Sequence, residues 1–201
     1  MHINPEELEA QQRYKLLIGT IIPRPIAFVS TIGKNGVRNL APFSYFNAVC
    51  FNPMIVAFFP LRYKKGDEIK DTVRNIRETG EFVVNVSTED LAEAVNKASG
   101  LYEYEKDEFE LTGLTPTPSK MIEPPGVLES PVRMECKLEK MISFGDDAGG
   151  ADAVFGRIVH LFVDDNLIDN YRIDERKLKP IARLAGNKFS KLGEIFDIER
   201  P

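Results

Sequence analysis

The chain has 201 residues and a formal net charge of −5, so we do not expect the broad basic surface that binds nucleic acid. Its composition, 43% hydrophobic and 28% charged, is that of an ordinary globular protein, and we expect one domain over residues 1–201. The longest apolar run, MIVAFF at 54–59, is too short to cross a membrane. The start, residues 1–15, is too charged for a signal peptide, which predicts a cytoplasmic protein.

The first elements form a predicted hairpin and a buried strand. A charged lead-in with a short helix is expected over residues 1–17, and a strand over 26–32. The turn 33–36 contains Asn-Gly, a strong hairpin signal, so the stretch 36–53 is expected to return as the partner strand. Unbroken apolarity predicts that 54–59 is a fully buried strand.

Two short helices are predicted among the strands that follow. The segment 70–80 predicts a helix that its final glycine stops, and 81–86 predicts another strand. Ser87 is expected to open the next helix, with Asp90 completing a box-like cap and Gly100 ending it.

The second half is predicted to contain a long hairpin. Residues 111–130 are irregular and rich in proline, and strands are expected over 132–144 and 153–165, joined by the acidic loop 145–152. The tail, 178–193, is expected to form loop and short helix. Strands joined by hairpin-length turns predict a mainly β protein with helical insertions, an antiparallel barrel and not a parallel α/β sheet.

Several kinds of chemistry have no basis in the sequence. The two cysteines, Cys50 and Cys136, lie in apolar segments and are expected to be buried thiols in a reducing compartment. There are two histidines and no Cys/His cluster for zinc. The phosphate loops GxxxxGK[ST] and GxGxxG and the GxSxG elbow are absent. We therefore predict no catalytic side chain and no metal, and expect any chemistry to belong to a bound cofactor.

Two other features have both a purely structural and a functional interpretation. The acidic loop 145–152 holds three carboxylates that could bind a hard cation, but its spacing matches no calcium loop, so a solvated hairpin loop is favoured. His160 lies in an alternating strand, where a half-buried histidine paired to backbone is favoured over a catalytic acid or base.

Polar residues interrupt the apolar stretch 43–50. If it is one strand, alternation places Ser44 on one face and Asn47 on the other, and each needs a backbone or ligand partner if buried. Pro42 cannot donate to a ladder, so it is expected to interrupt the pairing. The backbone groups of residues 39–43 would then be available to a flat heterocycle with a polar edge, such as a flavin; a plain sheet edge or bulge is the alternative.

The residues Lys70, Asp71 and Thr72 lie where a helix is predicted to begin. Free backbone N–H groups and the positive helix end favour a phosphate there, with the Lys70 amine and the Thr72 hydroxyl as added donors. The alternative, favoured if this motif is taken alone, is that Asp71 is an ordinary N-cap and Lys70 is solvated.

A family resemblance joins these signals. The segments PRPIAFVSTIGKNGVRNLAPFSYFNAVCFNPMIVAFFP (23–60) and KDTVRNIRETGEFVVNVSTEDLAEAVN (70–96) closely resemble the flavin reductase-like family of FMN-binding split barrels, in the branch that contains flavoredoxin. The tail PIARLAGNKFSKLG (180–193) resembles the closing segment of that branch. The resemblance implies an antiparallel split β-barrel, a homodimer, and FMN (with FAD as the alternative) in a groove at or near the subunit interface.

The resemblance also implies which residues surround the flavin. Those matching the strands along the isoalloxazine are Val29, Ser30, Thr31, Asn39, Leu40, Ala41, Pro42, Phe43 and Ser44. Those matching segments near the ribityl chain and phosphate are Phe46, Asn47, Ala48, Lys70, Asp71 and Thr72. Arg183 opens RLAGN, which matches the closing segment. In this interpretation the polar residues and the interrupted edge serve the flavin.

The implied activity is that of a cytoplasmic FMN oxidoreductase, in which NAD(P)H gives a hydride to flavin N5 and the reduced flavin passes electrons onward. Some small NAD(P)H-dependent reductases of the family carry a histidine where this chain has Ala151 and Asp152, so the nicotinamide donor stays open. One alternative is an FMN carrier between redox protein partners. Another is a ligand-free barrel that acts as an interaction module.

Overall fold

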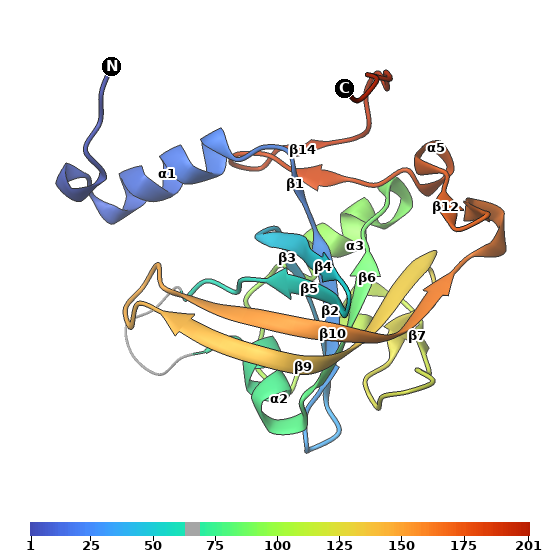
Figure 1. Cartoon of the computed structure of the whole chain (residues 1–201). Coiled ribbons are helices and arrows are strands. Elements are labelled where there is room, and N and C mark those ends of the chain that lie inside the picture. Colours follow the sequence, from blue (N-terminus) through green and yellow to red (C-terminus); the bar gives the residue numbers. More distant parts are fainter. Residues whose placement is uncertain (63–68) are drawn as a thin grey trace.

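The computed structural model describes residues 1–62 and 69–201 and is mainly antiparallel β-structure with short helices (Figure 1). The long strands are β2 (Ala27–Ile32), β3 (Arg38–Phe43), β4 (Phe46–Phe51), β5 (Met54–Phe58), β6 (Glu81–Val86), β9 (Val132–Phe144) and β10 (Ala151–Val163). The short strands are β1 (Arg24–Pro25), β7 (Pro116–Thr117), β8 (Gly126–Val127), β11 (Ile168–Asp169), β12 (Arg172–Ile173), β13 (Ala182–Arg183) and β14 (Phe189–Ser190). The helices are α1 (Ala10–Thr20), α2 (Asp71–Thr79), α3 (Ala92–Lys97), α4 (Glu108–Thr112) and α5 (Glu175–Leu178), with single 3-10 turns at Pro5–Glu7, Glu89–Leu91 and Asp165–Leu167.

The seven long strands form one antiparallel sheet in the order β3-β2-β6-β9-β10-β5-β4. Its two edge strands, β3 and β4, follow each other in the chain and are separated only by Ser44 and Tyr45. The sheet therefore curls back on itself, and in the described residues no ladder joins β3 to β4. The barrel is thus split at this place, which confirms the predicted antiparallel split β-barrel.

The core has two layers because β2 is buried on both faces. Alternation along β2 sends Ala27 and Val29 into the barrel and Phe28 outward, beneath α3 and α4. The inner cluster contains Ala27, Val29, Phe43, Val56, Phe58, Ile76, Phe82, Val84, Cys136 and Val154. The outer cluster contains Ile26, Phe28, Leu40, Leu91, Val95, Ala98, Phe109, Val127 and Ile181.

The inner layer leaves no room at Gly156 of β10. A Cβ added there would collide with the ring of Phe82, which is fully buried. We expect Gly156→Ala to lower the free energy of unfolding by about 1–3 kcal/mol, the usual cost of overpacking a core. Urea denaturation measures this loss. Gly19→Ala in α1 is the control because nothing lies near that position, and an equal effect of the two substitutions would contradict the packing argument.

Several predicted elements are confirmed. The strand at 26–32 is β2, and the turn before β3 places Gly36 at a positive φ of 81°. The helix at 70–80 is α2, and it ends at Gly80, whose φ is 72°. The long hairpin is β9 and β10, with the second strand starting two residues earlier than expected.

Three other predictions are wrong. The stretch 36–53 is not one strand, because the chain turns at Ser44 and Tyr45 and its halves pair with opposite edges of the sheet. The strand 54–59 is not fully buried: Met54 is 47% exposed because it pairs with the edge strand β4 near their connecting turn. Ser87 does not open a helix; its hydroxyl donates to the Ile26 carbonyl and the first helical turn follows Thr88.

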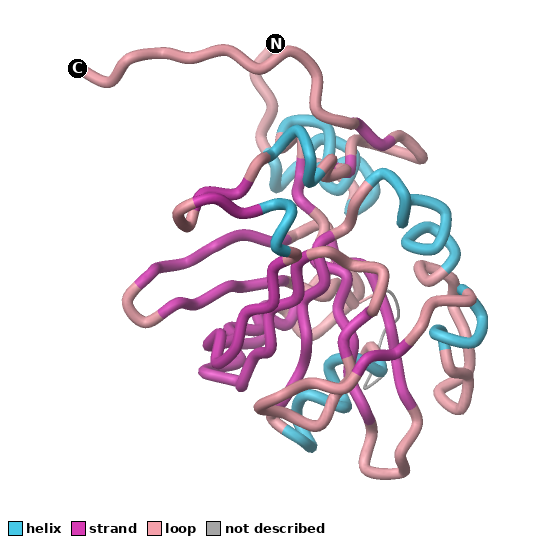
Figure 2. The backbone as a smooth tube through the Cα atoms, turned by 90° about the vertical axis from the view of Figure 1, so that its right-hand side faces the viewer, coloured by secondary structure: helices cyan, strands magenta, loops and turns pink. Residues whose placement is uncertain are grey.

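The two ends of the chain leave the body of the protein at the same end (Figure 2). Helix α1 runs to Thr20, beyond the predicted lead-in, and only Ile18 of its residues is buried. No helix in the described part of the chain is long and apolar enough to span a membrane.

Candidate functional site

The split in the barrel borders a groove made of two adjoining cavities. The first has a volume of about 280 Å³ and the second about 400 Å³. They share the lining residues Ala41, Leu61, Lys70, Ala98 and Gly100, so we treat them as one groove. Together they reach the size of a pocket for a drug-sized ligand.

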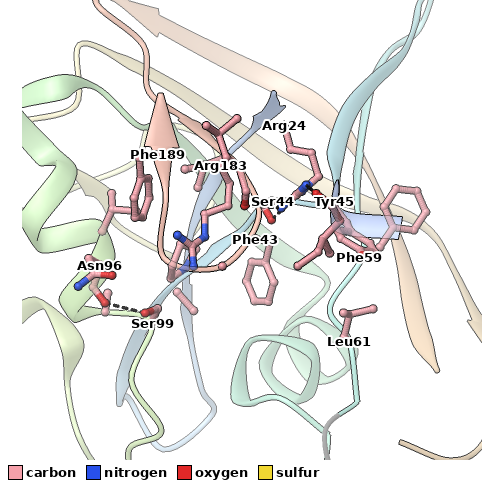
Figure 3. A pocket seen from close by; sticks show the side chains of 18 of the residues that line it. Arg24, Phe43, Ser44, Tyr45, Phe59, Leu61, Asn96, Ser99, Arg183 and Phe189 are labelled. Atoms are coloured by element: carbon pink, nitrogen blue, oxygen red, sulfur yellow. Dashed lines mark hydrogen bonds between the residues drawn. The ribbon is translucent and has the colours of Figure 1, made fainter. Parts of the chain in front are cut away.

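The first cavity lies between the end of β3, the end of α3 and the C-terminal strand pair (Figure 3). Phe43 and Ser44 form one side, and Asn96 faces them from α3. Arg183 of β13 lies between these sides, with its guanidinium 4.5 Å from the ring centroid of Phe189. The cavity therefore combines apolar walls with a cation at its C-terminal side.

Arg24 fixes one corner of the first cavity. It is buried and donates to the carbonyls of Ile18 and Ile21 at 2.7 Å, at the end of α1, and to the carbonyl of Leu184 at 3.1 Å. Its Nε donates to the Ser44 hydroxyl oxygen at 3.4 Å. Because Ser44 accepts this bond, its own hydrogen can turn toward a ligand. The sequence analysis did not select Arg24, although its place between Pro23 and Pro25 is distinctive.

Pro42 does not interrupt the pairing of β3, contrary to the prediction. The ladder with β2 continues through Phe28/Pro42 to the pair Ala27/Phe43. Because proline has no N–H, Phe28/Pro42 must be a non-hydrogen-bonded pair of the ladder. Hydrogen-bonded and non-hydrogen-bonded pairs alternate in an antiparallel ladder, so the backbone groups of Pro42 and of Leu40, two residues earlier, point away from β2. The Leu40 N–H indeed donates to Glu108 instead, at 2.9 Å. The Pro42 position therefore loses no ladder bond and leaves a carbonyl acceptor on the outer edge of β3.

The second cavity lies beside the start of α2. Its lining includes Asn39, Lys70, Asp71, Thr72, Arg74, Tyr104 and Glu108. The helix is capped at Lys70 and not at Asp71, so the alternative of an ordinary Asp71 cap is wrong. The Thr72 side chain, in a residue 1% exposed, donates to Asn39 Oδ1 at 2.6 Å. Its hydroxyl is therefore committed to the protein and is not the added phosphate donor that the sequence suggested.

Burial changes the charges around the second cavity. Desolvation lowers the pKa of Lys70, although the neighbouring Asp71 carboxylate opposes this change. Desolvation raises the pKa of Glu108, and the hydrogen bonds from Leu40 N–H and Asn39 offset part of that rise. A partly desolvated cation thus lies where the two cavities adjoin, and an anionic ligand group would stabilise it there.

The structure brings together only some of the predicted flavin residues. Those lining the first cavity are Ala41, Pro42, Phe43, Ser44, Lys70 and Arg183, and those lining the second are Asn39, Ala41, Lys70, Asp71 and Thr72. Lining residues that the sequence analysis missed include Arg24, Tyr45, Phe59, Leu61, Asn96, Ser99, Gly100 and Phe189. Most of these come from segments far from β3 in the sequence.

The remaining predicted residues line neither cavity. Val29, Ser30, Thr31 and Leu40 are buried in the interior, where the Ser30 hydroxyl donates to the Pro125 carbonyl at 2.6 Å. On β4, Phe46 packs against the inner core, whereas Asn47 and Ala48 are exposed. The Asn47 Oδ1 accepts from the Ala48 N–H at 2.9 Å. Asn47 and Ala48 therefore lie on the exposed side of β4.

Asp152 anchors the segment that leads to the groove. Its carboxylate, in a residue 1% exposed, accepts from Arg62 at 2.7 Å, Arg77 at 3.0 Å and Ser143 at 2.6 Å. Burial alone would raise the pKa of Asp152, but these hydrogen bonds and the two guanidinium charges outweigh it and lower the pKa. Leu61, beside Arg62, bridges to Ala151 and lines both cavities. No metal-binding group of three His, Cys, Asp or Glu side chains is found within residues 1–62 and 69–201.

His160 is not paired with backbone, contrary to the prediction, because its buried Nδ1 makes no hydrogen bond within the described residues. Its Nδ1 lies 3.1 Å from Glu135 Oε1. Glu135 also accepts from the backbone N–H groups of Lys120 and Met121 at 2.9 and 2.7 Å. His160 lines a separate cavity of about 40 Å³, so we assign it no part in the groove.

A curled antiparallel sheet with a groove along its split defines a ligand-binding split barrel. The sequence matches the Flavin reductase like domain over residues 18–181. The chain therefore belongs to the flavin reductase-like family of oxidoreductases, which confirms the resemblance seen in the sequence.

Solved structures agree with this assignment. Nitrilotriacetate monooxygenase component B from Bacillus cereus is 44% identical, with a TM-score of 0.94 over 98% of both chains. The 2-nitrobenzoate 2-nitroreductase NbaA of Pseudomonas fluorescens is 32% identical, with a TM-score of 0.90 over 100% of this chain and 96% of that one. Flavoredoxin of Desulfovibrio vulgaris, 22% identical with a TM-score of 0.74 over 89% of this chain and 91% of that one, shares the fold.

Proposed function

We propose that the protein binds FMN in the groove and works as a flavin reductase, accepting hydride from NAD(P)H at flavin N5 and passing electrons to a separate acceptor. The observation that carries this proposal is the continuous groove beside the split, with apolar walls, a polar strand edge and the cations Arg183, in the first cavity, and Lys70, where the cavities adjoin. When bound, the flavin would supply the hydride and electron chemistry, and the protein would bind, orient and shield it. The similarity to nitrilotriacetate monooxygenase component B from Bacillus cereus, one component of a monooxygenase, supports a separate acceptor.

The donor set of the groove fits a flavin. Ala41 and Phe43 offer an apolar wall for a flat ring, while the Pro42 carbonyl and the Ser44 hydroxyl offer an acceptor and a donor beside it. Those are the groups that the polar edge of an isoalloxazine requires. The Arg183 guanidinium adds a positive charge that would favour an electron-rich ligand.

The start of α2 fits a phosphate. Helix α2 has nine residues, and its first turn presents backbone N–H groups beside the Lys70 amine. Since the Thr72 hydroxyl donates to Asn39, its backbone N–H is the group left for the ligand. This arrangement favours FMN, whose phosphate ends the ribityl chain, and FAD is the alternative cofactor.

An absorbance spectrum before and after addition of NADH or NADPH, without air, tests the proposed function. We expect a yellow protein whose flavin bands bleach with one of the two donors. A yellow protein that bleaches with neither would contradict the reductase and favour an FMN carrier between protein partners. A colourless protein that takes up no added FMN would contradict both and favour an interaction module. Both cysteines are unpaired, which supports the proposed cytoplasmic location, but only Cys136 is buried as expected, and Cys50 on the edge strand β4 is exposed.

We expect Ser44→Ala to weaken FMN binding about threefold to tenfold, the effect of losing one neutral hydrogen bond to a ligand. The melting temperature of the apoprotein is expected to change little, because Ser44 lies at the cavity and not in either core cluster. Fluorescence titration and thermal unfolding on the same variant measure the two quantities. Ser119→Ala, which removes a hydroxyl bonded to the Pro124 carbonyl outside the groove, is the control. A destabilised apoprotein with native FMN affinity would argue against a ligand contact at Ser44.

The proposed holoprotein is a homodimer. The edge strand β4 exposes Val49 and Phe51, the latter 90%, and the adjacent Met54 is also exposed. A second copy would cover this apolar edge and supply a further wall for the groove, which would bring Asn47 and Ala48 into a site that they do not reach in one copy. We expect sedimentation of the FMN-loaded protein at micromolar concentration to give a dimer. A flavin-loaded monomer would refute this prediction.

A further inference from the structure

Glu108 is a buried carboxylate next to the second cavity. It is the first residue of α4 and is 5% exposed. Three hydrogen bonds reach it: Asn39 Nδ2 donates to both carboxylate oxygens at 3.1 Å, and the Leu40 N–H donates at 2.9 Å. A buried charge is costly unless it is well paired, and all three bonds come from two adjacent residues of β3. Glu108 therefore holds β3 where Asn39 and Ala41 line the second cavity.

The carboxylate also fixes the direction of the hydrogen bonds beyond it. An ionised carboxylate only accepts, so Asn39 must turn its amide nitrogen to Glu108 and its oxygen away. That oxygen accepts the Thr72 hydroxyl at 2.6 Å. Thr72 is the second residue of α2, so this chain of bonds runs from α4 through β3 to the helix start.

The bonded chain lies beside the second cavity, which Asn39, Thr72 and Glu108 all line. Asn39 lies two residues before Ala41, which lines both cavities, and Thr72 lies two residues after Lys70. A second buried contact, from Asn75 Nδ2 to the Thr31 hydroxyl at 3.0 Å, supports α2 against β2 one turn further on. The distance between the β3 wall and the start of α2 thus depends on buried polar contacts, of which the Glu108 chain is nearest the ligand groove.

We propose that Glu108 is a positioning residue that sets the spacing between the β3 wall and the start of α2, and so lets the groove prefer a flavin with a phosphate over the same flavin without one. The proposal rests on the proposed function, because it takes the ring to lie along β3 and the phosphate at α2. Glu108 itself need not touch the ligand. Its effect reaches the phosphate end through Asn39 and Thr72.

The test is the ratio of the FMN and riboflavin dissociation constants in Glu108→Gln. Glutamine keeps the shape but replaces one acceptor by an NH2 donor, so the three bonds from the Asn39 amide and the Leu40 N–H can no longer all form. The new NH2 group would face the Asn39 NH2 group unless Asn39 turned over and presented its NH2 group to Thr72. We expect FMN binding to weaken about tenfold and riboflavin binding less than about threefold, because bonds to a charged group are the stronger ones. A role in folding alone would weaken both flavins equally.

Two further variants complete the test. Glu110→Gln, on the same helix with its side chain 79% exposed, is the matched control and should leave both constants unchanged. Thr72→Val removes the far end of the bonded chain while keeping Glu108, and it should reproduce the selective loss if Glu108→Gln does not fold. Folded variants that keep the native ratio would overturn the positioning role while the proposed function stands. A native protein that binds neither flavin would overturn the proposed function and this inference with it.

Discussion

Replacing Lys70 by alanine is expected to weaken FMN binding about tenfold to a hundredfold and to change riboflavin binding less than about threefold. Lys70 caps α2 and lines both cavities, where burial lowers the pKa of its amine. A phosphate at this helix start would add a favourable interaction for the ammonium group, and riboflavin has no phosphate to offer. Titrating both flavins into the apoprotein, by quenching of their fluorescence, measures the two constants.

The control for Lys70→Ala is Lys97→Ala, which removes an exposed lysine of α3. This control changes the net charge by the same amount, so a general electrostatic attraction for FMN would appear in both variants. Equal losses for FMN and riboflavin in Lys70→Ala would show that the segment is an ordinary helix start.

We expect Asp152→Asn to lower the free energy of unfolding at neutral pH by about 3–5 kcal/mol, the usual cost of removing one partner from a buried ion pair. The substitution leaves the guanidinium groups of Arg62 and Arg77 facing an uncharged amide. It also replaces the oxygen that accepts from Arg62 Nε at 3.4 Å by an NH2 donor. Urea denaturation measures the loss. Asp147→Asn, in the exposed part of the same acidic loop, is the control.

The pH dependence of this loss has a definite sign. The folded-state pKa of Asp152 is lowered, so its stabilising contribution is present above the unfolded-state value of about 3.9 and disappears as the pH falls through the folded-state pKa. The native protein and Asp152→Asn should therefore differ most at neutral pH and converge below about pH 4. A constant difference across this range would show that the carboxylate charge is not the cause.

The elements that the sequence predicted well are those with local signals. Asn35 and Gly36 mark the hairpin between β2 and β3, and Gly80 stops α2 with a left-handed conformation. The family and its barrel were recognised because three segments resemble it in order and spacing. Strand β2 was located correctly, although its burial on both faces follows from α3 and α4, which pack on it from far along the chain.

The site was harder to predict because its geometry depends on distant contacts. Ser44 and Tyr45 look like the middle of a strand, and only the pairing of β3 and β4 with opposite edges makes them a turn. The Thr72 hydroxyl looks available until Asn39, 33 residues away, accepts its hydrogen. The Asn39 oxygen faces Thr72 because the Asn39 amide nitrogen donates to Glu108, 69 residues away. No local sequence pattern distinguishes Glu108 from other acidic residues.

The split between β3 and β4 has a consequence for how such a barrel can change during evolution. Both borders of the gap belong to one continuous stretch of chain, connected by Ser44 and Tyr45, so a short connection and not a ladder sets the width of the gap between β3 and β4. The Phe59 N–H donates to the Tyr45 carbonyl at 2.8 Å, which fastens that connection to the main chain after β5. Because Ser44 and Tyr45 line the first cavity, we expect an insertion before Tyr45 to enlarge that cavity while every pair in the seven-stranded sheet stays in register. A barrel of this kind can therefore acquire a binding site for a thicker or thinner ligand without first losing its fold.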